Sequence, residues 1–461
     1  MSYIHLIVLF LTGFTLVNLI SPKFSVLEKL GLSFSLAIGL VTMIMLPYDL
    51  LGVKINLTSL YIPQVLIIIF GLFFLVNKHG VKEVFSLNGF DKMKSANFFS
   101  INLPWIFLAL ILGYVMYVVI AKAMFWPTIS FDSVTGYDFV GRLIALEGKV
   151  NSSMFDPELP YNSIRSGYPL FIPGGFGYAY LMGFDSSKIT TVILILSTLF
   201  IYYGLLRNYA NHTISMLFTV LFITTPEYIA MSALSLSNVP HTLLVIVAVL
   251  ALAIWMDRGE KRYFYIGVIF MALNVWARSD GIIFIAGAGF ALFLYTVKTK
   301  AWKELVIFGV SAVLPFIIWQ LYLKGVLGMV NTDVFVSHLF WDGEKIDRMT
   351  ELIWKVITST QFYGIAPYLI PIGVLINYQT ILKKHTYLLV AILTSFLIYT
   401  MLYYQMNNGS EDFGYSLKAM INSSYKRGMF SIIGLFYFYI AISPMVQKLS
   451  KFVIESPSKN A

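Results

Sequence analysis

The chain has 461 residues, of which 58% are hydrophobic and 12% are charged, and its mean hydropathy is +0.78. No soluble core of this size buries so much apolar surface, so the composition predicts an all-α, polytopic membrane protein. The absence of cysteine excludes disulfides, thiolate metal ligands and cysteine nucleophiles. The formal net charge of +9 is explained better by the positive-inside rule than by nucleic-acid binding.

Apolar runs of about 17 to 20 residues predict thirteen membrane-spanning helices. The first run has no basic segment before it and no cleavage site after it, so we interpret it as a helix rather than a signal peptide. The stretch 168–183 is apolar but is interrupted by prolines and glycines, which predicts a helix lying along the membrane interface. The predicted spans lie near residues 3–20, 31–50, 59–77, 105–124, 188–206, 213–231, 239–256, 262–277, 281–297, 305–323, 362–379, 386–404 and 429–446.

The basic residues are distributed unequally between the two sets of loops. The loops that follow the odd-numbered predicted helices carry 18 of the 32 Lys and Arg residues and seven of the 23 acidic residues. The positive-inside rule therefore predicts that these loops are cytoplasmic, with the N-terminus external and the C-terminus cytoplasmic. The long loops 126–187, 324–361 and 405–428, and the short junction 278–280, then face the external side.

The basic stretch 77–104 suggests a division of the chain. On this interpretation, residues 1–104 form N-terminal helices and a cytoplasmic loop, and residues 105–461 form the membrane core. The same stretch has a simpler interpretation as an ordinary basic loop between two spans. Neither internal repeats nor a soluble domain are evident.

The segment from Trp126 to Lys188 is the longest interruption between apolar runs. Loops of this size between packed helices are usually functional or disordered, and the aromatic content of this one argues against disorder. Ionisable residues elsewhere also cluster at the external helix ends rather than at midplane depth, where ion-coupled transporters place them. We therefore expect this loop to be the active-site element of a reaction at the membrane surface.

The sequence contains none of three common catalytic or ligand-binding motifs that would identify the reaction. The chain has no Gly-rich phosphate loop, zinc-binding helix motif or nucleophile elbow. Of the six histidines, His241 and His338 fall on the predicted external side near other polar residues, but they do not indicate a metal site. We expect no resident cofactor; a divalent metal is compatible with the chemistry and is not supported by the sequence.

Four segments resemble bacterial membrane glycosyltransferases of the GT-C fold. The run FDSVTGYDFVGRLIALEG is similar to their first external loop, and SGYPLFIPGGFGYAYLMG is similar to their Tyr-Pro-Leu segment with its interfacial helix. The runs NVWARSDGIIF and INSSYKRGMF resemble the basic junctions that open later helices in these proteins. The segments follow the family order over residues 105–447. The protein O-mannosyltransferases and the aminoarabinose transferase are better-known relatives of this type.

The resemblance implies transfer of a sugar from a polyprenyl-phosphate donor to a glycan, lipid or protein acceptor in the cell envelope. The reaction would occur at the external, periplasmic face of a bacterial inner membrane, by direct displacement with inversion at the sugar carbon. The sequence departs from the family at three points. Phe131 stands where Trp is common, Asp132 is followed by Ser rather than Glu, and Asn238-Val239-Pro240 stands where Asp-Pro is often found.

One carboxylate is sufficient for this reaction. A phosphate is already a good leaving group, so the enzyme needs a base for the acceptor hydroxyl, whereas a glycoside hydrolase needs two carboxyl groups. We predict that Asp132 is the base because it follows a helix end; Asp138 is either an alternative base or the i,i+4 partner of Arg142. The predicted substrate-binding residues are Tyr137, Asp138, Arg142, Tyr168, Arg278, Asp280, Tyr425, Lys426 and Arg427.

Several of these residues also have simpler interpretations. Arg278 and Asp280 form either a substrate contact or a structural salt bridge, and Lys426 with Arg427 is either a phosphate site or a membrane anchor. For the whole protein, an O-antigen polymerase or ligase is the nearest alternative. A flippase for lipid-linked oligosaccharides, another transporter, or a scaffold subunit of an envelope-synthesis complex are the alternatives from other classes.

Overall fold

A computed structural model describes residues 2–85, 103–156, 158–159, 167–329, 341–378, 383, 385–405 and 417–448, and every regular element in these ranges is helical. Nine helices among the described residues are long and apolar enough to cross a membrane. The protein is therefore a polytopic membrane protein, as its composition predicts. These nine helices are α1 (Ser2–Ile20), α2 (Val26–Leu50), α3 (Leu57–His79), α6 (Leu103–Phe125), α9 (Lys188–Leu206), α12 (Asn238–Arg258), α14 (Ile282–Thr299, preceded by the 3-10 turn η5, Ser279–Gly281), α15 (Trp302–Gly325) and α19 (Thr386–Gln405).

The other predicted spans differ from continuous long helices. The span predicted near 213–231 is divided into α10 (His212–Ile223) and α11 (Pro226–Ser232), which are bent by 69°. The bend occurs where Pro226, which cannot donate a backbone hydrogen bond, begins α11. The span predicted near 362–379 is replaced by α17 (Thr360–Tyr363) and α18 (Ala366–Ile376); an 11-residue helix is about 16 Å long, too short to cross a bilayer.

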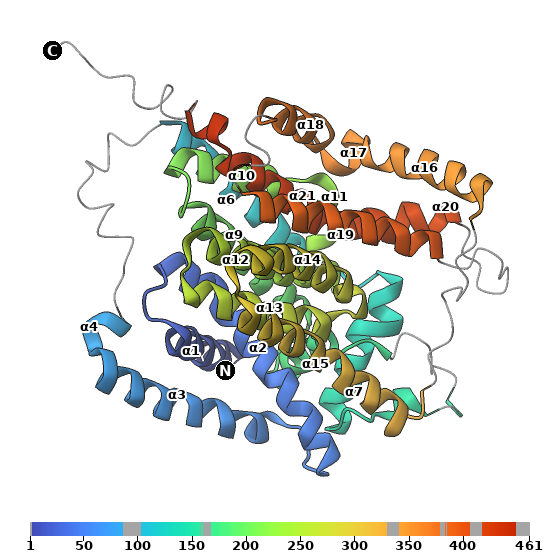
Figure 1. Cartoon of the computed structure of the whole chain (residues 1–461). Helices are drawn as coiled ribbons and strands as arrows, with labels where there is room; N and C mark the ends of the chain where they lie inside the picture. The colour runs from blue at the N-terminus through green and yellow to red at the C-terminus, as the bar shows by residue number, and fades with distance from the viewer. Residues whose placement is uncertain are drawn as a thin grey trace.

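Two further predicted spans are 17-residue helices, α13 (Lys261–Ala277) and α21 (Lys426–Ile442). Both pack against α12, which lies at the centre of the molecule (Figure 1). Every residue from 238 to 256 in α12 is buried, as expected for a helix that is apolar on all sides. By contrast, α3 and α6 lie at the periphery, and few of their apolar side chains are buried, as suits helices that face lipid.

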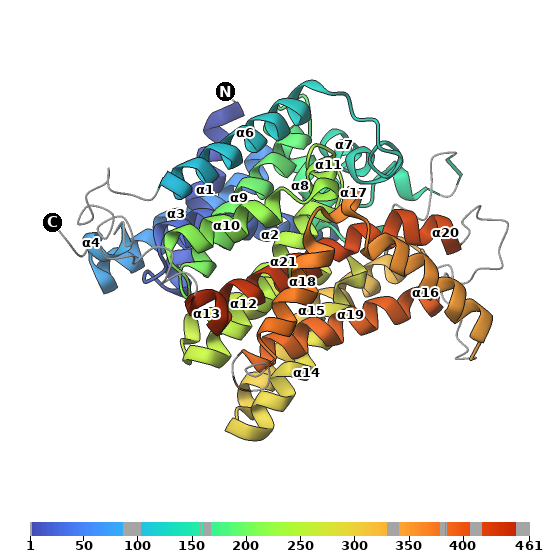
Figure 2. The same cartoon turned by 90° about the horizontal axis from the view of Figure 1, so that it is seen from above.

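The helix ends gather into two groups at opposite ends of the molecule (Figures 1 and 2), with α4 (Val81–Val84) at one end and α7 (Asp138–Glu147), α16 (Gly343–Ile357) and α20 (Leu417–Met420) at the other. At the first end, Asp257 contacts His385 and Lys261 contacts Glu304. The pairs named below for the candidate site all lie at the second end. The loops thus group as the distribution of basic residues predicts, and the compartment that each end faces stays a prediction.

The long loop between α6 and α9 is folded. It contains α7, a short 3-10 turn η3 (Ser153–Phe155) and α8 (Phe171–Leu181). This last segment is helical, as expected, but residues 171–179 are all buried and α8 packs among α2, α7 and α9. Its position along the membrane interface stays a prediction. The glycines of α8 allow this packing: a Cβ on Gly177 would lie 2.9 Å from the carbonyl oxygen of Gly141 on α7.

Helix α16 was not predicted. Met349, Ile353 and Val356 form its buried face, and these positions follow the i, i+4, i+7 spacing of an amphipathic helix. Asp342 caps the helix by accepting a hydrogen bond from the backbone N–H of Lys345 at 3.0 Å. The helix packs against α19 and α20 and thus covers part of the second end of the molecule.

Candidate functional site

Two π-helical turns lie within the two segments that contain most of the predicted site residues. The first, η2 (Ser133–Tyr137), leads into α7, and the second, η7 (Ile421–Tyr425), leads into α21. In each turn a backbone N–H bonds to the carbonyl five residues earlier, from Asp138 to Ser133 and from Lys426 to Ile421. Turns of this type are rare and are frequent at functional sites, so their occurrence at both predicted segments singles out this end of the molecule.

The two turns bring Asp132 and Arg427 together, although 295 residues separate them in the chain. Asp132 directly precedes the first turn, and its Oδ2 accepts a hydrogen bond from Nη1 of Arg427 at 3.2 Å. Nε of Arg427 donates to the carbonyl of Ser423 at 2.9 Å, within the second turn. The Asp132 and Arg427 side chains are 26% and 18% exposed, so a ligand can reach both.

A second arginine–aspartate pair lies at the junction between α13 and α14. Nε and Nη2 of Arg278 donate to the two carboxylate oxygens of Asp280 at 2.9 and 2.6 Å, and Nη1 donates to Oγ of Ser237 at 3.2 Å. Burial lowers the pKa of Arg278, but Asp280 more than offsets this and holds the pKa well above its ordinary value. The predicted salt bridge is therefore present, with strong bidentate geometry.

The predicted aromatic residues of the loop form a stack. The rings of Tyr137 and Tyr168 lie 4.4 Å apart and within 11° of parallel. Tyr137 is buried, and its hydroxyl is within hydrogen-bonding reach of Ser237, the residue that also contacts Arg278. Burial raises the pKa of Tyr137, and the neighbouring Tyr168 raises it further. Tyr168 is the more accessible ring of the stack, so it is the one that can contact a ligand.

Three tyrosines from α19 and η7 pack against one another at this end of the molecule. Tyr399 and Tyr403 lie one turn apart on α19, and their hydroxyls are 3.0 Å apart. Both rings contact Tyr425, at centroid distances of 5.4 and 5.1 Å. Tyr425 is fully buried and its hydroxyl contacts Thr400 at 3.1 Å, so its side chain acts here through packing. Tyr403 lies within electrostatic range of both Arg278 and Arg427.

Asp138 occupies a separate, buried position behind this cluster. Its Oδ1 accepts hydrogen bonds from the hydroxyls of Tyr180, at 2.6 Å, and Ser187. The expected ion pair between Asp138 and Arg142 is not formed, because Tyr180 lies between them: Nη2 of Arg142 donates to the Tyr180 hydroxyl at 3.3 Å. The Ser187 hydroxyl also contacts the Ser235 hydroxyl at 2.9 Å. Asp138 is thus held by hydroxyl groups on α8 and at the start of α9.

Lys426 is paired with an acidic residue. Its Nζ lies 2.7 Å from Oε1 of Glu227 in the first turn of α11 and 4.4 Å from the ring centroid of Phe362. Its backbone carbonyl accepts a hydrogen bond from the hydroxyl of Tyr363 at 2.9 Å. A specific acidic partner argues that Lys426 has a role inside the protein rather than that of a lipid anchor.

An apolar groove of about 210 Å³ lies near the start of α21. It lies between α18, α19 and α21, and its lining includes Pro371, Phe396 and Phe436. Tyr363 and Met429 line the groove near the site, and Met429 follows Arg427 by only two residues. The groove thus extends from near the basic start of α21 along apolar side chains of α18, α19 and α21.

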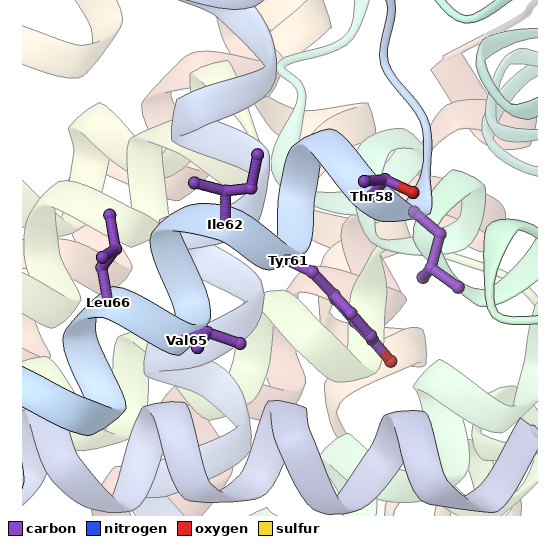
Figure 3. A pocket seen from close by; sticks show the side chains of 6 residues that line it. Thr58, Tyr61, Ile62, Val65 and Leu66 are labelled. Atoms are coloured by element: carbon purple, nitrogen blue, oxygen red, sulfur yellow. The ribbon is translucent and has the colours of Figure 1, made fainter.

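A larger hollow, of about 380 Å³, lies on α3 and has no connection with these residues (Figure 3). Its lining is apolar apart from Thr58 and the hydroxyl of Tyr61, which contacts His5 on α1. Both its position on a peripheral helix and its composition are those of a surface that contacts lipid.

The structure brings most of the predicted residues to one end of the molecule. Sequence reasoning missed several of the groups that connect them, which are Tyr180, Ser187, Ser235, Ser237, Tyr399 and Tyr403. The four-residue spacing of Tyr399 and Tyr403 was the available signal, since it places both on one face of a helix.

In the described part of the chain, the other candidates from the sequence do not form a metal site. His241 is buried in the first turn of α12 beside Phe284, and Asn238 begins the same helix. His338 lies outside the described residues. Among the described residues, no group of three or more His, Asp and Glu side chains is arranged to hold a metal ion.

Comparisons of this chain with protein-family models, with curated proteins and with solved structures found no match.

Proposed function

We propose that this protein is a GT-C-type membrane glycosyltransferase that transfers a sugar from a polyprenyl-phosphate donor to a cell-envelope acceptor. The reaction would occur at the external face of a bacterial inner membrane. The observation that carries the proposal is the 3.2 Å contact between Asp132 and Arg427. A carboxylate that can accept a proton and a guanidinium that can hold a phosphate are the two groups that this reaction requires of the protein.

The apolar groove supports a lipid-linked donor rather than a soluble one. A polyprenyl chain gains free energy by leaving water, and a groove lined by apolar side chains on α18, α19 and α21 provides a surface for its first units. The groove reaches Met429, two residues after Arg427, so a chain in it would place its phosphate near the basic start of α21. Arg427 would then hold the phosphate by charge-assisted hydrogen bonds.

The proposed transfer is a single displacement. The acceptor hydroxyl oxygen forms a bond to the anomeric carbon, and the bond between that carbon and the phosphate oxygen breaks, with its electron pair passing to the phosphate. The proton of the hydroxyl passes to the Asp132 carboxylate and from there to water. Polyprenyl phosphate leaves with one more negative charge than it carried in the donor, and Arg427 stabilises this charge.

The test is release of polyprenyl phosphate by the purified protein. The full chain in detergent is incubated with radiolabelled polyprenyl-phosphate sugars and an extract of envelope acceptors, and both products are measured. Asp132→Asn keeps the shape of the side chain but accepts no proton, so turnover should fall by roughly 10²–10⁴. Asp138→Asn should cost much less, because the hydrogen bonds of Asp138 are to Tyr180 and Ser187 rather than to Arg427.

Each alternative function gives a different result in this assay. A flippase or scaffold subunit releases no polyprenyl phosphate from any donor, and a polymerase or ligase transfers whole glycans rather than single sugars. An inactive Asp138→Asn beside a fully active Asp132→Asn would move the base to Asp138. If the wild-type protein releases polyprenyl phosphate from no donor, the proposal is wrong.

A further inference from the structure

The contact between Asp132 and Arg427 has a cost for the proposed reaction. Oδ2 of Asp132 accepts a hydrogen bond from Arg427, so this oxygen is not available to an acceptor hydroxyl at the same time. The carboxylate also offsets the positive charge that would attract a phosphate. We propose that a lipid phosphate binds by taking the place of Asp132 on Arg427, so that donor binding itself releases the base. This inference rests on the proposed function and adds the order of events at the same site.

The hydrogen bonds of Arg427 suit such an exchange. Its Nε donates to the Ser423 carbonyl at 2.9 Å, so the π turn holds the guanidinium in place independently of Asp132. The contact with Asp132 uses Nη1 and is longer, at 3.2 Å. Replacing Asp132 by a phosphate oxygen therefore breaks this contact and leaves the arginine already oriented. An arginine in a fixed orientation is the group that binds phosphate most specifically.

The ion pair between Arg278 and Asp280 is held more firmly than the pair between Asp132 and Arg427. Arg278 and Asp280 are two residues apart in one turn, and two bonds of 2.9 and 2.6 Å join them, with Ser237 as a third partner. A ligand would have to break both bonds and would leave Asp280 without its principal counter-charge. We therefore assign the exchange of a carboxylate for a phosphate to Arg427 and not to Arg278.

The position of the pair also provides access for an anionic headgroup. The apolar groove begins two residues after Arg427, at Met429, so a lipid chain in the groove would bring its phosphate to the partly exposed guanidinium. The phosphate offers more than one acceptor oxygen to the guanidinium and matches its fork geometry. Asp132 lies in the first turn of the helical stretch 131–147, ahead of η2 and α7, so its side chain can turn away from Arg427 without unfolding α7.

The binding test uses undecaprenyl phosphate and the full-length protein in detergent, with titration calorimetry as the measurement. Removing the competing charge in Asp132→Asn should tighten binding about fivefold, the size expected from a partly exposed ion pair. Arg427→Ala should weaken binding by at least about tenfold. The double variant should bind as weakly as Arg427→Ala alone, because Asp132 competes only through Arg427. If Asp132 and the phosphate did not compete for Arg427, the effects of the two substitutions on affinity would simply add.

Three controls test whether the change in affinity comes from Asp132 and from the phosphate. Glu344→Gln removes an exposed negative charge on α16 at the same end of the molecule and should leave affinity unchanged. Asp132→Ser should reproduce the tighter binding if the asparagine variant does not fold. Undecaprenol and inorganic phosphate separate the contributions of chain and headgroup, and Asp132→Asn should tighten the binding of the two phosphates but not of the alcohol.

Equal or weaker phosphate binding by folded Asp132→Asn and Asp132→Ser would overturn the exchange, as would an equal gain in Glu344→Gln. Because binding is measured without turnover, failure of the two proposals can be distinguished. A protein that transfers no sugar but shows the tighter binding retains the exchange and loses the enzyme assignment. A protein that transfers sugar without the tighter binding retains the enzyme assignment and loses the exchange.

Discussion

At the residue scale, Gly428 determines how closely α19 approaches the start of α21. A Cβ at this position would lie 1.8 Å from the Tyr399 hydroxyl oxygen and 2.3 Å from the ring carbon that carries it. No side-chain rotation of alanine relieves such a contact, so the Tyr399 side chain, α19 or α21 would have to move. Gly428 immediately follows Arg427, and any movement of α21 is transmitted to the arginine.

We therefore expect Gly428→Ala to destabilise the protein by about 1–3 kcal/mol, the usual range for overpacking, and to reduce phosphate binding. Thermal unfolding in detergent measures the first effect. Gly113→Ala on α6 is the matched control, since nothing lies within 4 Å of a Cβ there, and it should be neutral or slightly stabilising. Adding Tyr399→Leu to Gly428→Ala should recover part of the loss, and adding Tyr399→Phe should not, because the ring carbon remains.

Asp138 gives a second prediction at this scale. It is a buried carboxylate, and Tyr180 provides one of its two hydroxyl donors. Tyr180→Phe removes that donor and leaves Arg142 without its hydroxyl acceptor, so stability should fall by about 1–3 kcal/mol. The exposed Tyr114→Phe is the control and should change little. An equal melting temperature for Tyr180→Phe and wild type would contradict the role assigned to this hydroxyl.

The sequence identified the charged residues of the candidate site and one of their pairs, Arg278 with Asp280, but not the others. Polar residues at the ends of apolar helices are visible in one dimension, which is why Asp132, Arg278 and Arg427 could be selected. Spacing predicted a pair between Asp138 and Arg142, but Tyr180 from α8 separates them. The contact between Asp132 and Arg427 depends on the packing of distant helices, for which the sequence has no local signal.

At the scale of elements, α2 begins five residues earlier than its apolar run. Ser25 and Glu28 form a capping box, with each side chain bonded to the backbone N–H of the other. Oε1 of Glu28 also accepts hydrogen bonds from the Tyr263 hydroxyl at 2.6 Å and from Asn208 at 3.2 Å. One carboxylate thus starts α2 and ties it to α13 and to the turn after α9.

Glu28→Gln should therefore cost more stability than Ser25→Ala. Loss of an N-cap costs about 1 kcal/mol, whereas a buried carboxylate with several donors loses roughly 1.5–3 kcal/mol when its charge is removed. The measurement is thermal unfolding of both variants in the same detergent, with the exposed Glu344→Gln as the control for loss of a negative charge. A larger loss in Ser25→Ala would show that only the cap, and not the links to Tyr263 and Asn208, contributes.

Periodicity predicted the long helices well because length and hydropathy are local properties. It did not predict the breaks, since α10 and α11 together satisfy the same apolar pattern that one straight helix would. The two π turns were also not predictable, because their sequences, Ser133–Tyr137 and Ile421–Tyr425, differ little from ordinary helix starts. The burial of α8 was not predicted because its glycines were interpreted as breaks rather than as packing positions.

At the scale of the whole molecule, the two groups of loops define a topology that can be measured. A reporter fused after Lys303 should indicate the cytoplasm, and a reporter inserted within 150–160 should indicate the opposite side. Lys303 lies in the group that carries the excess of basic residues, and 150–160 lies in the group that contains the candidate site. Reversed signals would remove the external assignment of the site.

The same arrangement has a consequence for biosynthesis. The ribosome synthesises Asp132 295 residues before Arg427, so the carboxylate is made long before its partner exists. Until α21 arrives, α12 also lacks one of the helices that cover it. A chain interrupted at any point before α21 therefore lacks Arg427, the proposed phosphate ligand, and also lacks a closed core. Truncated products of this gene should be both inactive and readily degraded, whatever share of the remaining helices they contain.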